Sequence, residues 1–130
     1  MASLIFDTTF LIDFQRERKA KAGPAHDFLA EHADDYAYLP VTAYGEFCEG
    51  FTSPTHGTFL ALVDSFELVP VTPRVAEIYA SIARSLRAKG ALIGTNDLWI
   101  AATALECGHP LVTRNTADFT RIPGLRVVGY

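Results

Sequence analysis

Four acidic residues stand where their carboxylates can act together. Asp7 directly follows the short apolar run of residues 4–6, and Asp118 comes shortly after a later run of the same kind. Glu46 and Asp97 lie early in two segments whose apolar residues recur at helical spacing. In open α/β sheets, ligands collect beyond the carboxyl ends of the strands. We therefore expect the four side chains to meet at one edge of a sheet.

Converging carboxylates predict a bound cation. They repel one another, and keeping several of them ionised in a partly buried cleft is costly unless a positive ion neutralises them. Oxygen ligands without nearby His or Cys partners suit Mg²⁺ or Mn²⁺ better than zinc. Such an ion can activate a water molecule as nucleophile and stabilise charge on a phosphoryl group in transfer. The pattern favours metal-dependent hydrolysis of phosphodiester bonds.

Each acid, taken alone, also fits a structural role. Asp7 can cap a helix, and Asp97 can interact with the dipole at a helix N-terminus. Glu46 can be a solvated helix residue, and Asp118 can form part of an ordinary turn. Spacing alone leaves both interpretations open.

Short apolar strands alternate with helices along the chain. Strands are expected at residues 4–6, 36–39, 67–71, 111–112 and 125–128. Helices are expected at residues 8–14, from Pro24 onward, from residue 41 through Phe51, from Pro54 onward, from Pro73 to Gly90, and from residue 95 or 96 to Gly108. This alternation requires crossover connections, and it predicts the α/β class, with a parallel sheet covered on both faces. Thr95 or Asn96 is expected to cap the helix that carries Asp97.

Composition indicates one folded domain over residues 1–130. The chain is 49% hydrophobic and 20% charged, which is unlike disordered chains. Its net charge of −4 argues against broad, nonspecific coating of nucleic acids, because such binding depends on many Lys and Arg. A nuclease is still compatible with this charge, because bound cations would reverse the local sign of an acidic site.

Nothing in the chain predicts secretion or a membrane span. No apolar run approaches the roughly 20 residues that cross a bilayer, and the first residues lack the pattern of a signal peptide. Cys48 and Cys107 lie far apart and outside any Cys-x-x-Cys pair. We expect a cytoplasmic protein with two reduced, buried thiols, with a disulfide or a catalytic thiol as alternatives.

Four segments, in order, resemble the motifs of PIN-domain ribonucleases, and most closely those of VapC-type toxins from type II (VapBC) toxin–antitoxin systems. They are Leu4-Ile5-Phe6-Asp7-Thr8-Thr9, Val41-Thr42-Ala43-Tyr44-Gly45-Glu46-Phe47, Asn96-Asp97-Leu98-Trp99-Ile100-Ala101-Ala102 and Leu111-Val112-Thr113-Arg114-Asn115-Thr116-Ala117-Asp118-Phe119. The third is the most specific. Thr9 stands where the family commonly has Asn.

The resemblance implies a fold and an activity. The fold is a single PIN domain, Rossmann-like, with three α/β/α layers and a five-stranded parallel sheet. The activity is that of an endoribonuclease dependent on Mg²⁺ or Mn²⁺, which cleaves RNA, forms a homodimer and is neutralised by a VapB-type antitoxin. The catalytic acids would be Asp7, Glu46, Asp97 and Asp118. Asp7 and Asp97 would bind the metal directly, and the other two would act through water or at a second metal position.

Several neighbouring residues are candidates for supporting roles. Thr8, Thr113 and Asn115 are expected to orient the carboxylates or the attacking water, although local turns explain such residues at least as often. Arg114 lies between them and can meet a phosphate. The basic run of residues 16–21 can guide RNA, although charge runs more often form a solvated face.

Three other functions are compatible with parts of this pattern. A PIN nuclease of RNA processing or decay, without an antitoxin, would share the same site. A receiver-like signalling domain also gathers acids around Mg²⁺, but it needs an Asp after its third strand, and residues 67–72 provide none. A catalytically silent binding domain would lack one of the acids, and none is missing.

Overall fold

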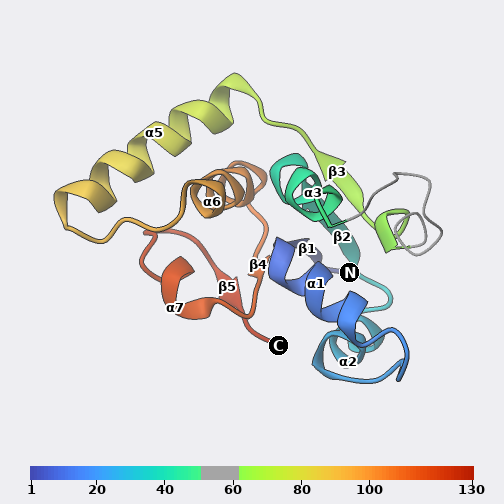
Figure 1. Cartoon of the computed structure of the whole chain (residues 1–130). Coiled ribbons are helices and arrows are strands. Elements are labelled where there is room, and N and C mark those ends of the chain that lie inside the picture. The colour runs from blue at the N-terminus through green and yellow to red at the C-terminus, as the bar shows by residue number, and fades with distance from the viewer. Residues whose placement is uncertain (51–61) are drawn as a thin grey trace.

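The computed structural model describes residues 1–50 and 62–130, and their strands form one parallel sheet (Figure 1). The strands are β1 (Ser3–Phe6), β2 (Tyr36–Pro40), β3 (Glu67–Val69), β4 (Leu111–Val112) and β5 (Val127–Val128). The predictions of an α/β fold and a five-stranded parallel sheet are confirmed. The helix expected from Pro54, and Phe51 before it, fall in the part of the chain outside the described residues, except for a short stretch at Leu62 and Val63.

The sheet has the strand order β3-β2-β1-β4-β5, with β1 at its centre. Ser3 of β1 is in register with Tyr36 of β2, and Ile5 of β1 with Leu111 of β4. The chain first runs outward from β1 to β3 and then returns past β1 to β4. Such a reversal between β1 and β4 is the place where α/β sheets open a crevice at the strand ends. Asp7, directly after β1, stands at this point.

Six helices within the described residues connect the strands. They are α1 (Thr8–Arg16), α2 (Pro24–Glu31), α3 (Val41–Cys48), α5 (Pro73–Ala88), α6 (Thr95–Cys107) and α7 (Thr116–Phe119). Their limits largely follow local signals. Proline occupies the first turn of α2 and α5, where its missing N–H costs nothing. Gly108 ends α6 in the left-handed conformation, with φ of 71°.

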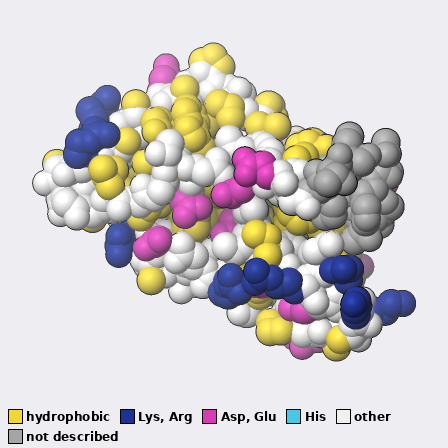
Figure 2. Space-filling model, in the orientation of Figure 1, with side chains coloured by type: hydrophobic (Ala, Val, Ile, Leu, Met, Phe, Trp, Pro, Cys, Tyr) yellow, Lys and Arg dark blue, Asp and Glu magenta, His cyan; other side chains and the backbone are white. Residues whose placement is uncertain are grey.

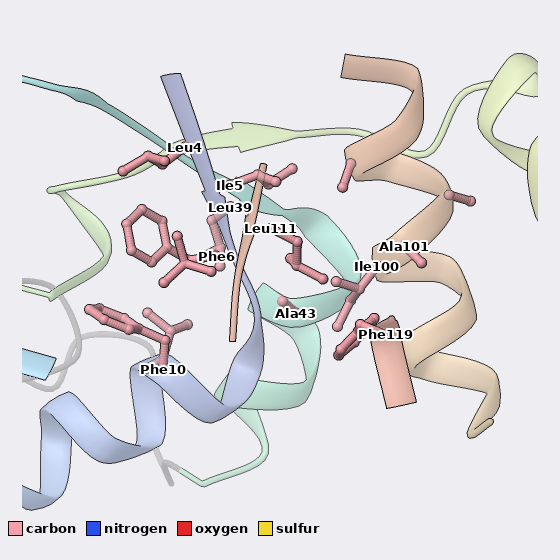
Figure 3. Packing of buried hydrophobic residues seen from close by; sticks show 14 of the residues in the cluster. Leu4, Ile5, Phe6, Phe10, Leu39, Ala43, Ile100, Ala101, Leu111 and Phe119 are labelled. Atoms are coloured by element: carbon pink, nitrogen blue, oxygen red, sulfur yellow. The ribbon is translucent and has the colours of Figure 1, made fainter. Parts of the chain in front are cut away.

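Apolar side chains on both faces of β1 form the core. In Figure 3, Phe6 lies with Phe10 on one side of β1, whereas Ile5 lies on the other side, together with Leu111 and Ile100. The Phe6 ring lies 4.6 Å from that of Phe10, 5.9 Å from Phe28 and 5.2 Å from Phe66. Helices α1 and α2 therefore cover one face, while α6 and α7 cover the other. The three-layer arrangement is confirmed.

Helix α5 forms an outer cover on α6 rather than on the sheet (Figure 1). The rings of Tyr79 and Trp99 stack between the two helices at 4.0 Å. The indole thus packs inside the described domain. Among the described helices, none is long and apolar enough to span a membrane. Cys48 and Cys107 are both free thiols, as predicted, but each is only partly buried.

Three local predictions were wrong. The third strand ends at Val69 instead of residue 71, because Pro70 has no N–H with which to continue the ladder. Helix α7 was not predicted, because four residues are too few to show a helical period. Gly94, rather than Thr95 or Asn96, is the N-cap of α6, and no side chain caps this helix.

Candidate active site

Asp7 is the buried centre of the site, with only 1% of its surface exposed. It caps helix α1, because its Oδ1 accepts a hydrogen bond from the Phe10 backbone N–H at 3.1 Å. The same oxygen accepts from the Thr9 hydroxyl at 2.7 Å, and Oδ2 accepts from the Thr113 hydroxyl at 2.5 Å. The structural role and the chemical one are therefore combined in one carboxylate, which is held in a fixed orientation.

The pKa of Asp7 is raised above its ordinary value. Burial is the largest cause, and the charge of Glu46 adds to it. Hydrogen bonds from Thr113, Thr9 and the Phe10 backbone act in the opposite direction. Loss of hydration therefore outweighs three hydrogen bonds. A positive charge beside Asp7 would stabilise the ionised form.

Asp97 lies in the first turn of α6 and is the acid most affected by the others. Its pKa is raised from 3.8 to about 6, first by burial and then by the charges of Asp7, Glu46 and Asp118. Carboxylates affect one another in this way only when they share a poorly screened region. The structure thus brings the four acids from four separate segments into one electrostatic environment.

Glu46, on α3, forms the exposed side of the site. Its Oε1 accepts a hydrogen bond at 2.9 Å from the side-chain amide of Asn96, which directly precedes Asp97. The contact joins α3 to the start of α6 across 50 residues of sequence. Asn96 orients Glu46 instead of capping its own helix, a role that no local signal indicates.

Asp118, on α7, is linked to Asp7 through two polar residues. Its Oδ2 accepts from the Asn115 side-chain amide at 3.0 Å, and the Asn115 backbone N–H donates to the Thr113 hydroxyl at 2.9 Å. The Thr113 hydroxyl in turn donates to Asp7. Thr113 and Asn115 therefore both donate hydrogen bonds to these carboxylates.

Thr8 does not orient a carboxylate as expected, and its expected action on the attacking water stays a prediction. Its hydroxyl is buried and has no hydrogen-bond partner in the described part of the chain, so it orients no carboxylate. The next residue, Thr9, binds Asp7 instead. Two residues after the N-cap, a short hydroxyl side chain can reach back to the capping carboxylate. The position where the family commonly has Asn thus still supplies a donor.

A second network, which the sequence did not predict, borders Asp7. Asp13 accepts hydrogen bonds from Arg114 Nη1 at 2.8 Å and from the Tyr130 hydroxyl at 2.6 Å. The pKa of Tyr130 is raised by burial, by its bond to Asp13 and by the charges of Asp13 and Asp7, while the nearby Thr9 hydroxyl lowers it. The partners of Asp13 are 101 and 117 residues away along the chain, so no local pattern identifies them.

The geometry of the acids sets a limit on metal binding. Within residues 1–50 and 62–130, no three His, Cys, Asp or Glu side chains are placed together closely enough to form a metal-binding group. Mg²⁺ does not need such a group, because it usually keeps several waters and takes one or two protein carboxylates together with substrate phosphates. The oxygen donors and the raised pKa values of Asp7 and Asp97 suit such an ion.

Charges of opposite sign lie next to one another on the face shown in Figure 2. Acidic side chains gather near the middle of this face, and Lys and Arg side chains lie beside them over α1 and the connection to α2. A hollow of about 210 Å³ between α1 and α3 adjoins the acids. It is lined by Ile12, Gln15, Arg16, Glu46, Phe47 and Gly50.

Comparisons with known proteins show the family of the chain. The model of the PIN domain family matches residues 4–125. A ribonuclease VapC of Rickettsia bellii is 44% identical over 72 residues, which are 55% of this chain and 54% of that protein, so the match spans about half of the relative. A ribonuclease VapC1 of Methanocaldococcus jannaschii is 29% identical over 129 residues, covering 97% of this chain and 87% of that protein.

Solved structures share the fold over nearly the whole chain. DNA-bound VapBC from Salmonella typhimurium matches with a TM-score of 0.80 and 25% identity, covering 99% of this chain and 98% of that one. The fold of this chain therefore has a counterpart among solved structures. With its family model matched from residue 4 to residue 125, the chain belongs to the PIN-domain family.

Proposed function

We propose that this chain is a metal-dependent endoribonuclease that hydrolyses RNA phosphodiester bonds and acts as the toxin of a VapBC-type pair. The observation that carries the proposal is the buried Asp7 carboxylate, which Thr9, Thr113 and the Phe10 backbone hold in place at a strand end of a PIN domain. The raised pKa of Asp97, to which the charges of three other acids contribute, agrees with it. The names of two relatives, both VapC ribonucleases, support RNA as the substrate. A receiver-like role is excluded, because in such sheets β1 lies between β2 and β3, whereas here it lies between β2 and β4.

We assign direct metal binding to Asp7 and Asp97 and water-mediated binding to Glu46 and Asp118. Asp7 is buried and has both oxygens held by donors, whereas Glu46 is exposed and bound to Asn96. A Mg²⁺ or Mn²⁺ ion at this place would supply a more acidic water and charge stabilisation for the phosphoryl group. Burial supports this division for Asp7 and Glu46, and the raised pKa of Asp97 supports a cation beside that carboxylate.

The chain's own residues would orient the reactants. Thr9 and Thr113 hold the Asp7 carboxylate in one rotamer, and Asn115 holds Asp118. A carboxylate fixed before substrate arrives pays little reorganisation during the reaction. Glu46 and Asp118 remain partly or fully exposed and can accept a proton from a water that attacks phosphorus.

The hollow beside Glu46 suggests how an antitoxin would inhibit. It combines apolar walls from Ile12 and Phe47 with the carboxylate of Glu46 at its edge. A VapB-type antitoxin could insert an amphipathic segment there, with a basic side chain directed at the acids. Such a side chain would compete with the metal for the same negative charge. We also propose a homodimer, as the resemblance implies, to be tested by sedimentation velocity.

Cleavage of RNA by the purified chain tests the proposal. We expect cleavage with Mg²⁺ or Mn²⁺, no cleavage with a chelator, and a loss of at least about a hundredfold in Asp7→Asn. Asp34→Asn, an exposed acid in the turn before β2, is the matched control and should cleave normally. Equal activity in Asp7→Asn and the wild type would contradict the proposal.

Expression in a bacterial host separates the toxin from a processing nuclease. Induced wild type should arrest growth, and the small protein encoded beside it should restore growth. Asp7→Asn should not arrest growth. Cleavage in vitro without arrest or rescue would support an RNA-processing nuclease that has no antitoxin.

A further inference from the structure

We propose that Arg114 binds a phosphate group of the RNA next to the acidic site. The inference deepens the proposed function and depends on it. It starts from an electrostatic problem, because four acids that repel one another also repel the phosphates of a substrate. A bound metal ion offsets part of this repulsion at the reacting phosphate. A fixed protein cation at the edge of the cluster would hold a neighbouring phosphate.

The position of Arg114 meets this requirement. It lies between Thr113, which donates to Asp7, and Asn115, which donates to Asp118. Its own side chain is 56% exposed and can therefore be reached from solvent. The backbone at this point is held on both sides by contacts to site acids.

The guanidinium is also held in place. Nη1 donates to Asp13 Oδ1 at 2.8 Å, and the Asp13 side chain is only 13% exposed. The other oxygen of Asp13 accepts from the Tyr130 hydroxyl at 2.6 Å, and the Tyr130 ring packs on Phe10 at 4.9 Å. Asp13 is thus fixed from two sides. In the described part of the chain, Asp13 accepts a hydrogen bond from one nitrogen of the Arg114 guanidinium, so Nε and Nη2 can donate to another acceptor.

Arginine suits this task better than lysine does. Its planar group can donate two parallel hydrogen bonds to phosphate oxygens, and less rotamer freedom is lost when the group is already oriented. The competing interpretation is an ordinary ion pair that fastens α1 to the loop after β4. Exposed ion pairs contribute little to stability, so this interpretation predicts a small effect on folding and none on RNA binding.

RNA binding and cleavage by Arg114 variants distinguish these interpretations. Cleavage of a short single-stranded RNA gives KM and kcat, and binding to an Asp97→Asn background gives Kd at several salt concentrations. Arg114→Ala should raise KM and Kd about tenfold or more, with a much smaller change in kcat. The slope of log Kd against log salt should fall by about 0.7, which is one phosphate contact on a single strand. Arg114→Lys should keep the slope and recover only part of the affinity.

Arg74→Ala is the matched control. Arg74 is 64% exposed and pairs with Glu77 and Glu106, so its removal also breaks surface ion pairs and also lowers the charge by one. Glu106 and Asp97 are near opposite ends of α6, about 13 Å apart along its axis at 1.5 Å per residue. We expect Arg74→Ala to match the wild type in KM, Kd and salt slope.

Two failures can be told apart. If Arg114→Ala has the same melting temperature, KM and slope of log Kd against log salt as the wild type, Arg114 does not bind phosphate and the inference is overturned. If the wild type cleaves no RNA with Mg²⁺ or Mn²⁺, the proposed function is wrong, whatever Arg114 does. Melting curves by circular dichroism show that each variant is folded when it is assayed.

Discussion

At the scale of single residues, the site consists of carboxylates that are costly to keep ionised. Asp7 is buried, Asp97 is partly buried and influenced by the charges of three other acids, and both have raised pKa values. Their repulsion is therefore present in the folded protein and absent in the unfolded chain. Without a cation, the site lowers the stability of the fold at neutral pH.

This cost predicts how the stability of the metal-free protein depends on pH. The pKa of Asp97 is 3.8 in its ordinary state and about 6 in the folded protein. At pH values between these two, the folded protein therefore binds a proton that the unfolded chain has released. Stability should fall as the pH rises from about 4 to about 6. Urea unfolding in a chelator, at several pH values, measures this. Stability that rises over this range would contradict the account.

Removing the charge of Asp97 should stabilise the metal-free protein at pH 7. A raised carboxyl pKa of this size corresponds to at most about 3 kcal/mol, and partial exposure reduces it to about 1–2 kcal/mol. Loss of a favourable helix-dipole contact costs about 0.5 kcal/mol, so repulsion outweighs it. Asp97→Asn should gain about 1 kcal/mol in urea unfolding with a chelator. The control Asp34→Asn should change little, and a less stable Asp97→Asn would refute this reasoning.

The hydrogen bond from the Thr113 hydroxyl to Asp7 should matter more for metal binding than for folding. Thr113→Val keeps the shape of a fully buried side chain but removes the hydroxyl that donates to Asp7 Oδ2. We expect Mn²⁺ affinity to fall about tenfold or more in calorimetric titration. Thr103→Val is the control, because Thr103 is equally buried and donates to the Trp99 carbonyl within α6. Equal Mn²⁺ affinity in the two variants would show that Thr113 has no part in the site.

At the scale of elements, the order of strands and helices could be predicted because each leaves a local period or a local cap signal. Strand pairing and side-chain contacts could not, because they join distant segments. Asn96 reaches Glu46 across 50 residues, and Arg114 reaches Asp13 across 101. The four acids were predicted by their placement at strand and helix ends, and a family resemblance supplied their order. The contacts that Thr9, Asp13 and Tyr130 make beside these acids could be found only from the structure.

Helix α2 shows how one element depends on another. Its N-cap, Gly23, has no side chain, and the Glu17 carboxylate takes over by accepting from the backbone N–H groups of Ala25 at 3.0 Å and His26 at 2.9 Å. Gly23 has φ of 144°, and a Cβ placed there would collide with Cδ of Glu17. The glycine is required both by the backbone conformation and by the closeness of the capping carboxylate.

Two glycine substitutions should change stability in opposite directions. Gly23→Ala should lower the free energy of unfolding by about 2 kcal/mol, because the backbone is strained and Glu17 is displaced. Gly45→Ala should raise it by about 0.5–1 kcal/mol, because Gly45 lies inside α3 with no atom within 4 Å of the added Cβ. Urea unfolding of both variants measures the difference. Stabilisation by Gly23→Ala would show that the cap is described wrongly.

At the scale of the whole molecule, the strand order explains why residues so far apart in sequence form one site. The reversal at β1 and β4 brings the ends of these strands, the start of α6 and helix α7 to one edge of the sheet. The acids gather there on a protein whose net charge is already −4. The central claim is that this edge binds a divalent cation through Asp7 and Asp97.

Titration of the purified protein with Mn²⁺, followed by electron paramagnetic resonance, tests the claim most directly. The wild type and Asp34→Asn should bind Mn²⁺ in a saturable way and with the same affinity. Asp7→Asn and Asp97→Asn should each lose this binding while keeping the circular dichroism spectrum of the folded protein. Unchanged Mn²⁺ affinity in both variants would contradict the account, because the metal would then be bound elsewhere.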